Sequence, residues 1–470
     1  MPDLDLAYAT ASELAGLYRR KKASPVEVME TALARIEQVN PKLNCFCFVY
    51  PEEALEGARA AERAFAEGED PGALAGVPIA FKDLTPTKGK RTTLGSRIYE
   101  HWVPEEDPAI VETLTGAGAI IVGKTATPEF AHAGFTESPL WGKTRNPWDL
   151  ERTPGGSSGG AGAAVASGCV PLAEGTDMGG SVRIPAAECG VVGLKPSLGR
   201  IPMDILPSLF DNISHFGPLA RSVEDAALFL AAAQGPDERD IQSLKPALAL
   251  PRPIPPRVEG RRLALSIDLG FYAVHPEIEA NTRAAAAALR DAGAAVEEVA
   301  LEWSAEIDWA WAKYWGVFMA AYFGQHLEQW RDRMDPDVVK LMDAGFAMSA
   351  VDYKRLEILR SKQWRALAKV LERFDALIAP TMAQPAAPVD GKFAEKAGYD
   401  AEGRFTSRYM TEPFNLVGQC PVLSVPTGFT AGGLPTALSI CGRRFDDLSV
   451  LEIGAALEQA RPWRDKRPAI

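Results

Sequence analysis

The chain has few histidines and cysteines for its length. It contains five histidines among 470 residues, and none of them forms the HExxH pattern of a zinc hydrolase. The six cysteines lie mostly in apolar segments, and the spacing of Cys45 and Cys47 does not fit a CxxC redox or zinc pair. We therefore expect reduced cysteines and no metal or other cofactor.

Long apolar runs and an excess of positive charge are also lacking. A membrane-spanning helix needs about 18 consecutive apolar residues, and the sequence contains no such run. The first ten residues, MPDLDLAYAT, are not typical of a signal peptide. The formal net charge of −12 disfavours nucleic acid or an anionic membrane surface as the main partner. We expect a cytoplasmic monomer or homodimer that acts on a small molecule, without a nucleic-acid or membrane partner.

Glycine and serine gather in residues 152–200, where Ser157, Ser158 and Ser181 are flanked by glycines. A serine among glycines exposes its hydroxyl group beside unhindered backbone N–H groups, which can stabilise an oxyanion. This pattern predicts Ser181, in the run Gly-Gly-Ser-Val-Arg, as a nucleophile, although the GxSxG elbow is absent. A phosphate-binding loop is the competing interpretation, but the GxxxxGK(S/T) pattern is missing.

A serine nucleophile needs a base, and Lys82 is a candidate. It ends the apolar run 77–81, and desolvation at the end of a buried strand would lower the pKa of its amine. On local pattern alone, a lysine that extends to solvent from the strand end is the favoured interpretation of Lys82. A Ser–His–Asp triad assembled in space also stays open, with His215 and His132 as the nearest histidines in sequence.

Several motifs occur together in this chain. They include GVPIAFKDL (76–84), RTPGGSSGG (152–160) and GTDMGGSVRIPAA (175–187), and further motifs lie at 123–131, 142–149, 193–200, 375–381, 414–429 and 433–447. In these motifs, which cover about half of the chain, the sequence resembles the amidase signature family of serine hydrolases. The resemblance implies an α/β fold with one large, mixed and mostly parallel β-sheet covered by helices on both faces.

The resemblance also implies roles for individual residues. Ser181 would be the acyl-accepting nucleophile, and Lys82 would be the terminal base of a Ser–Ser–Lys triad. Ser157 would bridge the two through its hydroxyl group, held by a cis peptide bond with Gly156. The oxyanion would be stabilised by the backbone N–H groups of Met178, Gly179, Gly180 and Ser181.

Hydrophobic periodicity predicts helices over residues 9–40, broken at Ser24 and Pro25, and over 52–68. Short apolar strands then alternate with helices, which favours an α/β sheet with both faces covered. We expect a single domain over 1–470. Its parts would be a signature core at 65–235, a less family-typical helical and aromatic segment at 262–350, and a C-terminal part at 370–460 that completes the sheet.

Aromatic residues are concentrated at 303–330, and two interpretations of this segment stay open. The aromatic side chains could pack inward from a pair of core helices, or they could form a pocket wall that favours apolar groups. The apolar loop 203–216 follows the signature region and should lie near the site. The predicted substrate-binding residues are Thr136, Glu137, Trp141, Leu206, Phe210, Phe216 and Trp315.

The sequence therefore predicts an amidohydrolase that cleaves amide bonds of apolar, aryl or oligoamide substrates through an acyl-enzyme. Carbamates and esters are plausible further substrates, because their carbonyl groups need the same attack. The alternative is the glutaminase (A) subunit of a tRNA-dependent amidotransferase, against which the tryptophan-rich segment weighs. A catalytically inactive binding protein is disfavoured because Lys82, Ser157 and Ser181 are all present.

Overall fold

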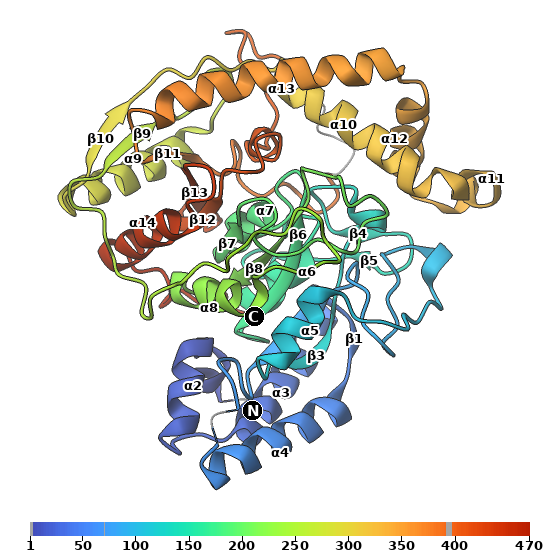
Figure 1. The fold of residues 1–470 in the computed structure, drawn as a ribbon, viewed down its shortest axis with the longest axis vertical. Helices are drawn as coiled ribbons and strands as arrows, with labels where there is room; N and C mark the ends of the chain where they lie inside the picture. Colours follow the sequence, from blue (N-terminus) through green and yellow to red (C-terminus); the bar gives the residue numbers. More distant parts are fainter. Residues whose placement is uncertain (1–2, 70, 392–396) are drawn as a thin grey trace.

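A large mixed sheet organises the molecule (Figure 1). The computed structural model describes residues 3–69, 71–391 and 397–470, and these residues form a sheet of 11 strands in the order β1-β3-β2-β6-β8-β7-β12-β13-β11-β9-β10. A separate two-stranded ribbon joins β4 and β5. The strands are β1 (Phe46–Val49), β2 (Pro78–Lys82), β3 (Ile120–Thr125), β4 (Glu137–Ser138), β5 (Gly142–Lys143), β6 (Leu172–Asp177), β7 (Val192–Lys195), β8 (His215–Ala220), β9 (Arg262–Leu265), β10 (Ala295–Glu298), β11 (Ala376–Pro380), β12 (Val422–Phe429) and β13 (Pro435–Gly442).

Parallel pairing is concentrated in two blocks of this sheet. One block pairs β2 with β3 and β6, and the other pairs β9 with β10 and β11. Strands between the blocks pair antiparallel, partly because a tight turn joins β12 to β13 as a hairpin. The expected large mixed sheet is thus confirmed, while its predominantly parallel character holds for the two blocks and not for the strands between them.

The N-terminal helices begin where the sequence pattern predicts. Thr10 and Ser24 both form capping boxes, with Glu13 and Glu27 as their partners, so the predicted break at Ser24 is the start of a new helix. The α-helices are α1 (Leu4–Ala7), α2 (Ala11–Arg19), α3 (Pro25–Leu43), α4 (Pro51–Glu67), α5 (Ala109–Gly116), α6 (Gly159–Ala166), α7 (Arg183–Cys189), α8 (Val223–Ala233), α9 (Pro276–Asp291), α10 (Glu306–Phe323), α11 (Leu327–Trp330), α12 (Pro336–Phe346), α13 (Ala350–Leu371) and α14 (Asp447–Ala460). Short 3₁₀ helices are η1 (Arg97–Tyr99), η2 (Glu129–Ala131), η3 (Gly324–His326), η4 (Arg331–Arg333) and η5 (Glu412–Phe414).

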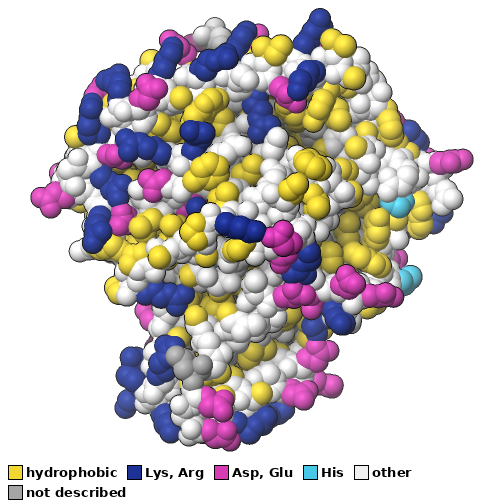
Figure 2. Space-filling view, viewed as in Figure 1, with side chains coloured by type: hydrophobic (Ala, Val, Ile, Leu, Met, Phe, Trp, Pro, Cys, Tyr) yellow, Lys and Arg dark blue, Asp and Glu magenta, His cyan; other side chains and the backbone are white. Residues whose placement is uncertain are grey.

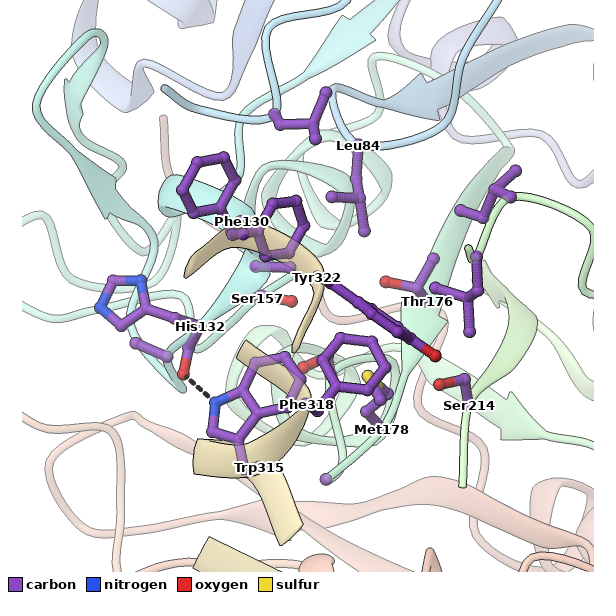
Figure 3. Close-up of a pocket in the computed structure, with 18 of the residues that line it drawn as sticks. Leu84, Phe130, His132, Ser157, Thr176, Met178, Ser214, Trp315, Phe318 and Tyr322 are labelled. Carbon is purple, nitrogen blue, oxygen red and sulfur yellow. Dashed lines mark hydrogen bonds between the residues drawn. The ribbon is translucent and has the colours of Figure 1, made fainter. Parts of the chain in front are cut away.

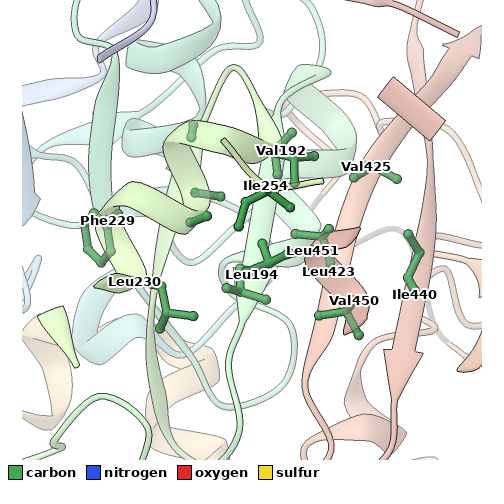
Figure 4. Packing of buried hydrophobic residues seen from close by; sticks show 14 of the residues in the cluster. Val192, Leu194, Phe229, Leu230, Ile254, Leu423, Val425, Ile440, Val450 and Leu451 are labelled. Carbon is green, nitrogen blue, oxygen red and sulfur yellow. The ribbon is translucent and has the colours of Figure 1, made fainter. Parts of the chain in front are cut away.

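Side chains alternate between two hydrophobic clusters on the two faces of the sheet. In β2, Ile79 and Phe81 belong to the cluster under α5, α8, α9 and α14, whereas Ala80 belongs to the cluster under α3, α4, α6 and α7. Figure 4 shows the first of these clusters where Val192, Leu194, Leu423 and Leu451 meet. Helices therefore cover both faces, as expected.

Helices α10, α12 and α13 form a separate layer at the end of the molecule opposite α2, α3 and α4 (Figure 1). In the same view, Figure 2 shows hydrophobic side chains gathered below α10 and α12, beside the β4–β5 ribbon. Within the described residues, no helix combines the length and apolar composition that a membrane crossing requires.

Candidate active site

A cavity of about 340 Å³ lies between the glycine-rich loops and the layer formed by α10. The loops that follow β2 and β6 supply Leu84, Met178 and Ser181 to its lining, and α10 supplies Trp315 and further aromatic side chains. Figure 3 shows Ser157 and Thr176 near the rings of Trp315, Phe318 and Tyr322, with the Tyr322 ring between the two hydroxyl groups in this view. Hydroxyl groups from the loops and aromatic side chains from α10 therefore line the same cavity.

Lys82 is buried at the end of β2 and does not reach solvent. Its Nζ donates hydrogen bonds to Ser157 Oγ at 2.6 Å and to Thr176 Oγ1 at 2.9 Å. The interpretation of Lys82 as a solvent-exposed strand end is therefore wrong, because the apolar strand β2 is buried along its whole length.

Burial lowers the pKa of Lys82 to about 7, although the nearby Glu174 and Asp177 act in the opposite direction. Glu174 lies under the same strand end, where one carboxylate oxygen accepts the backbone N–H of Lys82 at 2.9 Å. Burial also raises the pKa of Glu174. A substantial fraction of Lys82 is therefore a neutral amine near pH 7, able to accept a proton.

The loop that carries Ser157 is fixed through its backbone. The peptide bond between Gly156 and Ser157 is cis, as the resemblance implied. The N–H of Ser158 donates to the Ser181 carbonyl oxygen at 3.2 Å, so the two serine loops are joined next to the cavity. Thr136 Oγ1 bonds the same loop, since it donates to the Gly155 carbonyl at 2.8 Å.

The loop that carries Ser181 folds around a buried ion pair. Arg183 donates from Nε and Nη2 to the two carboxylate oxygens of Asp177, each at 2.9 Å. Burial alone would raise the pKa of Asp177, but Arg183 and Asn415 hold that pKa well below its usual range. The ion pair therefore persists at neutral pH and stiffens the loop that carries Ser181.

The predicted oxyanion-stabilising groups do not all face the cavity. Met178, Gly179 and Ser181 line it. The N–H of Gly180, however, donates to Asp177 Oδ1 at 2.9 Å, so this donor is already engaged away from the cavity. Gly180 has a φ of 121°, which glycine adopts readily, and this conformation turns its N–H toward the carboxylate.

Two distant elements hold the loop of residues 178–181, and sequence reasoning missed both contacts. Trp311 Nε1 on α10 donates to the Met178 carbonyl at 2.8 Å, and Thr411 Oγ1 donates to the Gly179 carbonyl at 2.6 Å. A Cβ on Gly179 would overlap the Trp311 ring, so only glycine fits there. No local signal in the sequence joins positions so far apart.

The histidines are poor candidates for the base. His215 is buried outside the cavity lining, with its ring nitrogens facing the carbonyl oxygens of Asp177 at 3.2 Å and Gly418 at 3.1 Å. Burial, and next Lys195, lower the pKa of His215 to about 3. His132 lines the cavity, but its Nδ1 lies 2.8 Å from the carbonyl oxygen of Glu129.

His132 also belongs to a group of possible metal ligands with Asp335 and Asp337, whose ligand atoms lie within 4.8 Å of one another. Asp335 has a structural use in this group, because it caps α12 by accepting the N–H of Asp337 at 2.9 Å.

The structure places some of the predicted substrate-binding residues at the cavity and others away from it. Leu206 and Trp315 line the cavity, whereas the other five do not. Phe216 is buried in the core because the alternation of β8 turns it under the sheet, and Phe210 is 76% exposed. Thr136 braces the Ser157 loop, Glu137 lies in the β4–β5 ribbon, and Trp141 Nε1 donates to Thr93 Oγ1 at 2.9 Å.

Both interpretations of the aromatic segment apply, to different side chains. Trp303 and Tyr314 pack in a hydrophobic cluster with α13. The cavity is lined by the side chains that recur on one face of α10: Trp311, Trp315, Phe318 and Tyr322. Their helical spacing is a signal that could have separated them from the core-facing aromatic residues.

Comparisons with known proteins identify the family of this chain. The Amidase family model matches residues 27–451. The chain belongs to the amidase family. An acylamidase of Rhodococcus erythropolis is 37% identical over 473 residues, which cover 100% of this chain and 99% of the relative. A solved structure of a bacterial aryl acylamidase, a member of the amidase signature enzymes, matches with a TM-score of 0.91 and 33% identity, covering 97% of each chain.

A glutamyl-tRNA(Gln) amidotransferase chain of Moorella thermoacetica is also similar, with 36% identity over 495 residues that cover 99% of both chains. Membership of the amidase family makes the protein an amidohydrolase, a hydrolase acting on C–N amide bonds.

Proposed function

We propose that this amidase hydrolyses apolar and aryl amides through an acyl-enzyme on Ser181, with Ser157 as the bridge and Lys82 as the base. The observation that carries the proposal is the 2.6 Å hydrogen bond between Lys82 Nζ and Ser157 Oγ beside a cavity that Ser181 also lines. A buried amine with a pKa of about 7 is suited to general-base catalysis near neutral pH.

The mechanism is a proton relay in two half-reactions. Neutral Lys82 takes a proton from Ser157, and Ser157 takes a proton from Ser181 as the Ser181 oxygen attacks the carbonyl carbon. The protons return along the same path to the leaving nitrogen, because an amine leaves only when protonated. Water then attacks the acyl-enzyme with the same base and releases the acid.

Backbone N–H groups around the nucleophile stabilise the tetrahedral intermediate. Of the four predicted donors, Met178, Gly179 and Ser181 line the cavity, so the proposal rests on these three. Removing one donor of this kind typically costs about 2.7–4 kcal/mol of transition-state stabilisation. Trp311 and Thr411 hold the carbonyl groups of the loop, which keeps the N–H groups oriented before substrate arrives.

The cavity supports an apolar amide over glutamine as substrate. Free glutamine carries an α-carboxylate, which needs a cation in a desolvated site. Among the described residues that line the cavity, none is a lysine or an arginine. Aromatic walls instead favour aryl and long apolar groups, and aryl carbamates and esters present the same carbonyl chemistry to Ser181.

A hydrolysis screen of the purified protein tests this proposal. The substrates are the p-nitroanilide of a medium-chain fatty acid, an aryl carbamate, a linear amide and L-glutamine, each with the Ser181→Ala variant as control. We expect turnover of the apolar substrates that disappears in the variant. Turnover of glutamine alone would contradict the proposal and favour a role in an amidotransferase, and an active Ser181→Ala variant would overturn the assignment of the nucleophile.

A further inference from the structure

The aromatic wall of the cavity contains a carboxyl group that the proton relay does not use. Among the described lining residues, Glu412 provides the only carboxyl group, and nine others are aromatic: Tyr99, Trp102, Phe130, Trp311, Trp315, Phe318, Tyr322, Phe323 and Tyr409. A carboxyl group is costly in such an apolar surface unless it has a partner.

The carboxyl group of Glu412 is paired with a second acid. Its side chain hydrogen-bonds that of Asp308, which lies on α10 one turn before Trp311. The hydroxyl group of Tyr272 donates to Asp308 Oδ1 at 3.1 Å from the other side. Asp308 is buried and Glu412 is half-buried at the cavity wall. Two carboxyl groups in contact in such a setting do not both ionise, so the pair shares a proton and keeps at most one negative charge. Burial, and next Asp308, raise the pKa of Glu412 well above its usual range.

The protein provides little compensation for the charge of this pair. Among the described residues, the cation that acts on Glu412 is Arg183, whose Nε and Nη2 are bound to Asp177 and whose Nη1 donates to the Thr411 carbonyl at 3.0 Å. A cation that enters from the cavity would supply the missing partner, and it would lie among ring faces that also attract positive charge.

We propose that Glu412 and the aromatic side chains around it form a subsite for a protonated amine carried by the amide substrate. This inference rests on the proposed function, because the amine is placed in the same cavity as the bond to be cleaved. Glu412 follows Thr411, which is hydrogen-bonded to Gly179, so the subsite adjoins the nucleophile loop. The favoured substrates are thus amphipathic amides with an aryl body and a basic amine.

Matched substrates test this proposal. One pair is the p-nitroanilides of 4-(aminomethyl)benzoic acid and 4-ethylbenzoic acid; the other is the benzoyl amides of 4-(aminomethyl)aniline and 4-ethylaniline. Within each pair, an ammonium group replaces a methyl group of similar size. We expect at least one pair to show a kcat/KM about tenfold higher for the amine, and the pair that does so shows which side of the amide bond faces Glu412.

Two variants test whether Glu412 causes the preference for the amine substrates. Glu412→Gln keeps the shape of the side chain and should remove the preference for the amine. Glu306→Gln is the matched control, because Glu306 lies on α10 near Asp308 but is exposed to solvent. The preference should survive in this control. A preference of equal size in both variants would overturn the role of Glu412.

Binding to the Ser181→Ala variant separates this inference from the proposed function. Calorimetry at pH 7 should give a Kd about tenfold lower for the aminomethyl compound than for the ethyl compound of the favoured pair. In the double variant Ser181→Ala, Glu412→Gln, the two compounds should bind with the same Kd. Equal affinity for amine and ethyl compounds in both pairs would refute the amine subsite, even where the wild-type protein hydrolyses the neutral compounds. Amine binding without hydrolysis of any amide by the wild type would instead refute the proposed function.

Discussion

Lys82 and Lys195 each end a buried strand of the same sheet, but their amines contact different kinds of oxygen. Lys82 Nζ bonds the hydroxyl groups of Ser157 and Thr176, whereas Lys195 Nζ donates to the carbonyl groups of Pro196, Gly418 and Cys420 at 3.2, 3.2 and 2.7 Å. Burial lowers both pKa values, to about 7 for Lys82 and about 8 for Lys195.

The difference supports the proposal that Lys82 is the base and gives Lys195 a structural role. A carbonyl oxygen only accepts, so three carbonyl groups occupy all three N–H groups of the Lys195 ammonium ion. A hydroxyl group can also donate, so a neutral Lys82 amine still has a partner in Ser157, and that partner can pass a proton onward. Burial alone therefore does not identify a catalytic lysine; the oxygens around it do.

Replacing Lys82 should give the largest effect. Lys82→Met removes the proposed base and leaves Ser157 and Thr176, whose hydroxyl groups can bond each other or water. We expect kcat/KM to fall by about 10³-fold or more, with a thermal midpoint close to that of the wild type. Steady-state kinetics and thermal unfolding measure the two quantities. Wild-type activity in Lys82→Met would return the base to a histidine.

Replacing Lys195 should give the opposite pattern. Lys195→Met removes the Nζ donor from three buried carbonyl groups. The Gly418 carbonyl keeps the Leu198 N–H at 2.9 Å, whereas the Pro196 and Cys420 carbonyls lose the donor that Lys195 supplies, and each such loss costs about 1–3 kcal/mol. We expect a loss of several kcal/mol in stability, seen as a lower thermal or denaturant midpoint, while kcat/KM per folded molecule stays within a few-fold of wild type. Lost activity at unchanged stability would instead make Lys195 part of the chemistry.

Removing one hydroxyl group from the Lys82 environment should have a smaller effect. Thr176→Val preserves the shape of the side chain but deletes one of the two hydrogen bonds of Nζ. A bond of this kind contributes about 1 kcal/mol, so we expect kcat/KM to fall by up to about tenfold. The relay through Ser157 remains, and Ser157→Ala is the comparison variant. An equal loss in both variants would contradict the bridging role of Ser157.

Sequence motifs were sufficient to predict the residues of the proposed relay, but not the contacts that orient the loop around Ser181. Lys82, Ser157 and Ser181 stand in short motifs, and the structure places Lys82 in contact with Ser157 and both serines at one cavity. The direction of the Gly180 N–H depends on the φ of that residue and on the Asp177 carboxylate, neither of which a motif encodes.

The substrate pocket was harder to predict because its contacts are distant in sequence. Phe216 belongs to an apolar stretch whose strand register, fixed by pairing with β6, turns it into the core. Glu412 reaches the cavity only because η5 packs against α10. The helical spacing of Trp311, Trp315, Phe318 and Tyr322 was visible in the sequence. The sequence did not show that this helix face lines the cavity.

The pH dependence of kcat/KM for an apolar p-nitroanilide tests the central claim most directly. Only the neutral amine of Lys82 can accept a proton, so activity should fall as pH drops through its pKa. Below that pKa, log kcat/KM should rise by one unit per pH unit, and it should level off above about pH 7. Lys82→Met should lose this inflection together with most of its rate. An inflection near pH 7 that persists unchanged in Lys82→Met would contradict the account.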